Sequence, residues 1–121
     1  MAVTEKVHHI HFRSVELILV DENEITEINR EFLDRDYVTD IISFNYSDET
    51  DLLSIEGSLY CCLPRIVEQS YEFNASIQCE LSRIFVHGLL HLAGYEDDTS
   101  EKRETMTLLE NQILKLAGIE L

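Results

Sequence analysis

The stretch from His87 to Asp97, HGLLHLAGYED, decides both the expected fold and the expected site. His87 and His91 are four residues apart, so on a helix they project from one face, separated by only about 40° around the axis. Gly94 can adopt the left-handed conformation that ends a helix, so the residues after it can return toward both imidazoles. With Asp97 as a carboxylate donor, the stretch predicts a three-ligand metal site with an open position, as in catalytic zinc sites.

Three neighbouring acidic residues compete for the role of third ligand. Asp97 has the favoured spacing after the glycine, whereas Asp98 is expected to cap the next helix. Glu96 is the alternative ligand. Glu80 precedes His87 by seven residues, which places it about 10 Å away along the helix axis, so we expect it to pack near the site and not to bind the metal.

Gly88 occupies the position at which many zinc proteases carry their general base. Those enzymes also have two histidines four residues apart, with Glu directly after the first of them. A peptidase of that mechanism is therefore disfavoured. Two histidines and one carboxylate also match the facial triad of non-haem Fe(II) enzymes. Because the two histidines are neighbours on one helix without an adjacent glutamate base, we favour a hydrolytic zinc site with one Zn²⁺ per chain.

Length and composition indicate an ordered globular protein. The 121 residues fit a single domain, 1–121, and 45% of them are apolar, with one proline and four glycines. The chain has neither an apolar run long enough to span a bilayer nor a signal-peptide pattern at its start, so we expect a cytoplasmic protein without a membrane partner. A net charge of −15 argues against non-specific binding to nucleic acid, and DNA is not an expected partner.

Two further groups of potential metal ligands are interpreted as structural. His8, His9 and His11 stand close together, and we expect them in an exposed or strand-forming segment, not in a metal site. Of the three cysteines, Cys61 and Cys62 are adjacent and Cys79 stands alone, which gives neither a disulfide framework nor a CxxC zinc spacing. We therefore expect the cysteines to be small core residues in a reducing compartment.

Hydrophobic periodicity and helix start signals predict the order of the elements. Asp21 followed by Glu24 is a capping-box pattern that starts a helix, and Pro64 suits the first turn of another. In order, the chain is expected to form a strand at 13–20, a helix from about residue 22, and strands at 39–46 and 55–62. Three further helices are expected to begin near residue 64, after a cap at Asn74 or Ser76, and near residue 98. This order predicts the α+β class, with a small mixed β-sheet packed by helices and a zincin-like central helix that carries the histidines.

The same stretch resembles a known family signature. HGLLHLAGYED is similar to the H-G-x-L-H-L-x-G-Y-D-H motif of the YbeY family of rRNA maturation factors, which are single-domain zinc-dependent endoribonucleases. Upstream, TDIISF at 39–44 is similar to the family's T-D-V-L-S-F segment, and Gly57 begins a stretch similar to its G-D-I strand. These blocks also have the family's order and separation, so the resemblance covers roughly residues 15–117.

The resemblance implies a function and its partners. It implies a single-strand-specific, zinc-dependent endoribonuclease that acts late in rRNA processing, in maturation of the 3′ end of the small-subunit rRNA and in ribosome quality control. The implied partners are the rRNA precursor and the small ribosomal subunit or its associated proteins. Because the chain is strongly acidic, we expect such a partner to supply much of the targeting.

The resemblance also implies roles for individual residues. His87, His91 and Asp97 would hold the zinc, with Asp97 standing where the family usually has a third histidine. Arg65 is the nearest equivalent of the family's arginine after the G-D-I strand and would clamp the phosphate. A surface role for this arginine is the alternative.

Two features of the sheet region are linked to the same site. Thr39, Asp40 and Ser43 are expected to line the cleft, with hydrogen bonds at a strand end as the alternative role. Ser58 stands where the G-D-I strand has Asp, which removes a carboxylate near the sheet.

Two other functions are kept open. The first is a non-catalytic ribosome-assembly binding protein with a structural zinc, which a fourth protein ligand would favour. The second is a metallohydrolase that acts on another substrate, including a peptidase with an unconventional base.

Overall fold

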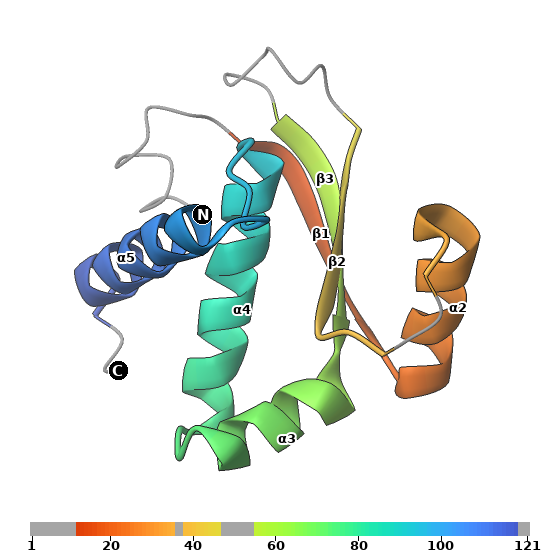
Figure 1. Cartoon of the computed structure of the whole chain (residues 1–121), viewed down its shortest axis with the longest axis horizontal. Coiled ribbons are helices and arrows are strands. Elements are labelled where there is room, and N and C mark those ends of the chain that lie inside the picture. Colours follow the sequence, from red (N-terminus) through yellow and green to blue (C-terminus); the bar gives the residue numbers. More distant parts are fainter. Residues whose placement is uncertain (1–11, 36–37, 47–54, 119–121) are drawn as a thin grey trace.

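The computed structural model describes residues 12–35, 38–46 and 55–118 (Figure 1). The cluster of His8, His9 and His11 lies outside these residues. The strands and helices are β1 (Phe12–Val20), α2 (Glu22–Leu33), β2 (Ile41–Asn45), β3 (Ile55–Cys62), α3 (Leu63–Glu72), α4 (Ile77–Leu92) and α5 (Ser100–Leu116). Their order is the predicted one and confirms the α+β class. Within the described residues, no helix is both long enough and apolar enough to cross a membrane.

The three strands form a mixed sheet with β3 in the middle, in the order β1-β3-β2. β1 runs parallel to β3, and β2 runs antiparallel to it. α4, with α5 beyond it, covers one face of the sheet, and α2 lies on the other side (Figure 1). Because helices cover both faces, β3 is buried along most of its length.

Short polar side chains determine where the helices begin. The predicted capping box is present at α2, where the Asp21 carboxylate accepts a hydrogen bond from the Glu24 amide at 2.8 Å. At α5 the predicted cap is wrong by one residue, because Thr99, not Asp98, accepts from the Lys102 amide at 3.1 Å. The Asp98 carboxylate instead pairs with the Lys102 ammonium at 3.0 Å, which leaves the Thr99 hydroxyl to satisfy the helix amide.

Two glycines allow α4 to lie close to the sheet. A Cβ on Gly88 would be 2.7 Å from Ile41 and 2.9 Å from Leu59, and a Cβ on Gly57 would be 2.7 Å from Leu92. These separations are well below the optimum for carbon contacts, which is about 3.5–4.0 Å. Gly88 is therefore a packing residue, and α4 has no room at this position for the glutamate that zinc proteases use.

The core contains two of the cysteines. Cys61 and Cys62 lie at the end of β3 and are buried, as expected for small core residues, whereas the third cysteine, Cys79 on α4, is only partly buried. Burial, together with the nearby charge of Asp40, raises the pKa of Cys61 to about 12. Such a thiol stays neutral and unreactive near pH 7.

Candidate metal centre

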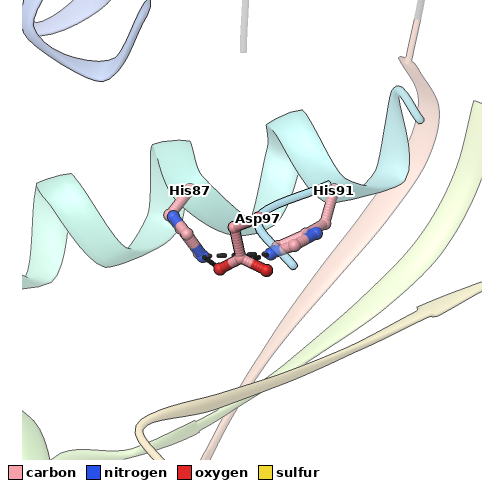
Figure 2. A group of neighbouring side chains, drawn as sticks. All are labelled: His87, His91 and Asp97. Atoms are coloured by element: carbon pink, nitrogen blue, oxygen red, sulfur yellow. Dashed lines mark hydrogen bonds and ion pairs between the residues drawn. The ribbon is translucent and has the colours of Figure 1, made fainter. Parts of the chain in front are cut away.

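The last two turns of α4 present two histidines toward the sheet. His87 and His91 are half-buried, with 23% and 28% of their side chains exposed. Gly94 follows the helix with a left-handed φ of 100°, as the sequence predicts for a residue that turns the chain back. Figure 2 shows the result, in which Asp97 reaches both imidazoles from the loop after α4, on the side that faces the strands.

The three side chains are close enough to share one metal ion. Their ligand atoms lie within 4.8 Å of one another. The Nε2 atoms of His87 and His91 are 3.0 Å apart, and Oδ2 of Asp97 is 3.4 Å from the first and 3.7 Å from the second. In a tetrahedral zinc site with bonds of about 2.0–2.2 Å, neighbouring ligand atoms are about 3.3–3.6 Å apart. The donor set and its spacing therefore fit a zinc ion.

The other two acids of this loop do not join the group. Glu96 and Asp98 both pair with the ammonium of Lys102, at 3.4 Å and 3.0 Å. The structure thus brings Asp97 to the histidines and leaves its two neighbours with a lysine. Among the described residues, no fourth side chain of ligand type completes the group, so the arrangement has the open position typical of catalytic zinc.

The three side chains of His87, His91 and Asp97, called the ligand group below, form part of the wall of a cleft of about 570 Å³. β2 and the turn before it form another part, and Thr39, Asp40 and Ser43 line the cleft as expected. Asn45 ties the strand to the helix, because its Nδ2 donates a hydrogen bond to the Leu92 carbonyl at 2.9 Å. Of the residues that line this cleft, three are acidic and none is lysine or arginine.

A buried carboxylate from α5 contacts the first histidine. Oε2 of Glu110 lies 2.9 Å from Nδ1 of His87, and the whole residue is only 6% exposed. Its other oxygen, Oε1, is 3.4 Å from Nη1 of Arg83. A carboxylate that contacts the outer nitrogen of a ligand histidine is a common support of metal sites.

Sequence reasoning missed Glu110, although its position on α5 carries a signal. It lies four residues after Met106 and three before Ile113, and both of these residues are buried. Glu110 therefore belongs to the apolar face of the helix, where a charged residue needs a partner. The identity of that partner depends on how α5 packs on α4, which helical periodicity alone does not give.

The two imidazoles have different electrostatic surroundings. Burial lowers the pKa of His87, but the hydrogen bond and charge of Glu110 and the charge of Asp97 outweigh this effect, so the pKa is raised. Burial and the neighbouring His87 lower the pKa of His91. At neutral pH His91 is therefore in the uncharged form, which is the form of imidazole that binds zinc.

The remaining candidate residues lie outside the ligand group. Arg65 is on α3, where its Nη1 is 2.8 Å from Glu68 and 3.3 Å from Glu72, and it does not line the cleft. Glu80 is buried and does not join the ligand group, as expected. Ser58 is buried in β3 on the sheet face opposite to α4, because side chains alternate along a strand and the preceding glycine faces α4. Ser58 is therefore not part of the ligand group.

Comparison with known proteins gives consistent matches. A family model described as "Endoribonuclease YbeY" matches residues 1–118. Endoribonuclease YbeY of Ureaplasma urealyticum is 41% identical over 107 residues, which cover 88% of this chain and 69% of that protein. Endoribonuclease YbeY of Chlorobaculum tepidum is 41% identical over 101 residues, which cover 84% of this chain and 72% of that protein.

A solved structure is also similar. The solution structure of TM1509 from Thermotoga maritima matches with a TM-score of 0.57 and 30% sequence identity, over 94% of this chain and 75% of that one. The family match includes all three stretches that carry the resemblance: residues 39–44, the stretch that begins at Gly57, and residues 87–97. The chain therefore belongs to the YbeY family of endoribonucleases.

Proposed function

We propose that His87, His91 and Asp97 bind one zinc ion and that the protein cleaves RNA at this site. Zinc in a site of this kind supplies a Lewis acid for a phosphate oxygen and lowers the pKa of water. The observation that carries the proposal is the convergence of three ligand-type side chains in one open cleft of an endoribonuclease-family protein.

The residues around the cleft would hold the RNA against the ligand group. The two imidazoles turn their Nε2 atoms toward a common point, and Asp97 adds a negative charge there. The hydroxyl groups of Thr39 and Ser43, which also line the cleft, can donate hydrogen bonds to phosphate oxygens or to 2′-hydroxyl groups. RNA that lies in the cleft would therefore contact β2 while one of its phosphates faces the ligands.

The proposed substrate is single-stranded precursor rRNA. We infer a role late in rRNA processing, in maturation of the 3′ end of the small-subunit rRNA and in ribosome quality control, in the cytoplasm. Family membership supports this role. The chain has a net charge of −15, and the lining of the cleft includes acidic residues but no lysine or arginine. Such a surface does not attract free RNA. The small ribosomal subunit or its associated proteins would therefore bring the precursor to the site.

The two alternative functions have less support from the ligand group. A structural zinc in a non-catalytic assembly protein is normally closed by four protein ligands, and the described residues supply three. A peptidase would need a base elsewhere, because the residue after the first histidine is Gly88, which packs on the sheet. An experiment on rRNA processing in cells distinguishes the proposed nuclease from a metallohydrolase that acts on another substrate.

Cells that carry His91→Ala are expected to accumulate small-subunit rRNA precursor with an unprocessed 3′ end, because the site loses one of its ligands. The measurement is the ratio of precursor to mature 3′ ends, determined by mapping the ends of the RNA. Gln78→Ala changes an exposed residue of the same helix and should process rRNA like the wild type. Normal processing in cells with a stably folded His91→Ala protein would count against the nuclease.

Arg65 is the residue that we propose to clamp the phosphate. It lies four residues before Gln69 and therefore on the same face of α3. Gln69 donates a hydrogen bond to the Asp40 carboxylate, which lines the cleft, at 3.3 Å. RNA that extends past Asp40 would meet this face of α3 and would replace the two glutamates that now pair with Arg65.

Arg65→Gln is expected to lower kcat/KM for precursor cleavage by about tenfold to a hundredfold, since hydrogen bonds to charged groups contribute about 1.5–3 kcal/mol. Arg13→Gln is the matched control, because Arg13 also forms an ion pair but lies on β1. The two values of kcat/KM are compared with that of the wild type. An unchanged value in Arg65→Gln would show that this arginine has only a surface role.

A further inference from the structure

The buried carboxylate of Glu110 carries an inference beyond the three ligands. We propose that Glu110 is a positioning residue that holds the His87 ring with Nε2 toward the metal, and that Arg83 fixes the carboxylate in turn. This inference rests on the proposed zinc site, and it assigns a role to two residues that do not contact the metal.

The contact between α5 and α4 determines which nitrogen of His87 carries the hydrogen. Oε2 of Glu110 is 2.9 Å from Nδ1 of the ring, and an ionised carboxylate only accepts, so Nδ1 donates. In the neutral ring, Nε2 then keeps its lone pair. Nε2 is the atom that lies near His91 and Asp97. The contact therefore selects the tautomer of His87 that can bind a metal with the observed geometry.

Arg83 holds the carboxylate from the same helix as the histidine. It lies four residues before His87 on α4, so both side chains project from one face toward α5. Each contacts a different oxygen of Glu110, and Nη2 of Arg83 also donates to Oδ1 of Asn111 at 2.7 Å. The cation balances a carboxylate that would otherwise be buried at a high free-energy cost. The position of Glu110 is thus constrained on both sides.

The second histidine has a support of another kind. His91 forms a hydrogen bond with the backbone of Tyr95, which is a neutral group. A change at Glu110 should therefore alter the tautomer of His87 and leave His91 almost unaffected. This difference distinguishes a positioning role from a general loss of structure.

The test compares Glu110→Gln with Glu80→Gln. Glu80 is also a buried acid, its charge interacts with those of Arg83 and Glu110, and it stands outside the ligand group, so it controls for the loss of a buried charge near this pair. Zinc affinity is measured by competition with a chelator, and the tautomers of both histidines are measured by ¹⁵N NMR of the metal-free protein. Glu110→Gln is expected to weaken zinc binding by about tenfold to a hundredfold, the usual effect of removing such a support.

At a pH at which the His87 ring is neutral, the NMR spectrum should show its Nδ1–H tautomer in the wild type and in Glu80→Gln, and a mixture of tautomers in Glu110→Gln. Unchanged zinc affinity and an unchanged His87 tautomer in Glu110→Gln would overturn the inference. If Glu110→Gln does not fold, Arg83→Gln replaces it and should change the same two readouts in the same direction, and unchanged values there would likewise overturn the inference. If the wild type binds no zinc, the proposed zinc site fails, while the tautomer measurement still decides the role of Glu110.

Discussion

The Asp97→Ala variant is expected to lose most of its bound zinc, whereas Glu96→Ala keeps it. Asp97 places an oxygen 3.4 Å and 3.7 Å from the two imidazole Nε2 atoms, while Glu96 pairs with Lys102. Removal of Asp97 leaves two histidines, and zinc sites in proteins normally have at least three protein ligands. Elemental analysis after dialysis should give about one zinc per chain for the wild type and Glu96→Ala, and close to none for Asp97→Ala.

A third variant, Asp97→His, tests whether this effect comes from the lost ligand. Histidine is also a zinc ligand, and the Asp97 side chain is 41% exposed, so a larger ring has room. Asp97→His should therefore retain zinc where Asp97→Ala does not. Zinc retained by Asp97→Ala but lost from Glu96→Ala would transfer the role of third ligand to Glu96.

Gly88→Ala is expected to destabilise the fold, although alanine is the better helix former by about 0.5–1 kcal/mol. The new Cβ would lie 2.7 Å from Cδ1 of Ile41 and 2.9 Å from Cδ2 of Leu59, so these two core-facing side chains would have to repack. Overpacking of a core costs about 1–3 kcal/mol, which exceeds the gain in helix propensity. The free energy of unfolding, measured with urea, should fall by about 1–2 kcal/mol. Gly88→Glu would add a buried charge and should be less stable still.

Gln78→Ala is the control for this measurement, because Gln78 is exposed on the same helix. Its free energy of unfolding should stay within about 0.5 kcal/mol of the wild-type value. Since Gly88 lies between the two histidines in sequence, repacking at this position should also weaken zinc binding in Gly88→Ala. If Gly88→Ala were more stable than the wild type, the close packing of α4 on the sheet would be incorrect.

The sequence predicted the parts of the site that depend on local geometry. The spacing of His87 and His91 places them on one helix face, and Gly94 has the left-handed conformation that returns the chain. Asp97 follows at a fixed short distance along the chain, so the loop has few ways to place it. Local rules of this kind also predicted the order of strands and helices and the capping box at α2.

The features that the sequence did not predict depend on competition between neighbouring residues for the same helix cap, or on tertiary packing. Thr99 and Asp98 are both good helix caps, and the choice between them depends on Lys102, which pairs with the carboxylate. Glu110 contacts His87 only because α5 crosses α4, and no spacing rule joins residues of two helices. The family resemblance led us to expect Arg65 at the phosphate. In the structure its guanidinium pairs with two glutamates of its own helix, α3.

We expect RNA cleavage by this protein to require a zinc ion held by His87, His91 and Asp97. The most direct test measures cleavage of precursor small-subunit particles by the purified protein as isolated, after removal of metal with a chelator, and after return of one equivalent of zinc. We expect the wild type to lose activity when the metal is removed and to recover it when zinc is returned, while His91→Ala does not recover. Undiminished cleavage by the metal-free wild type, or full recovery of His91→Ala, would contradict this expectation.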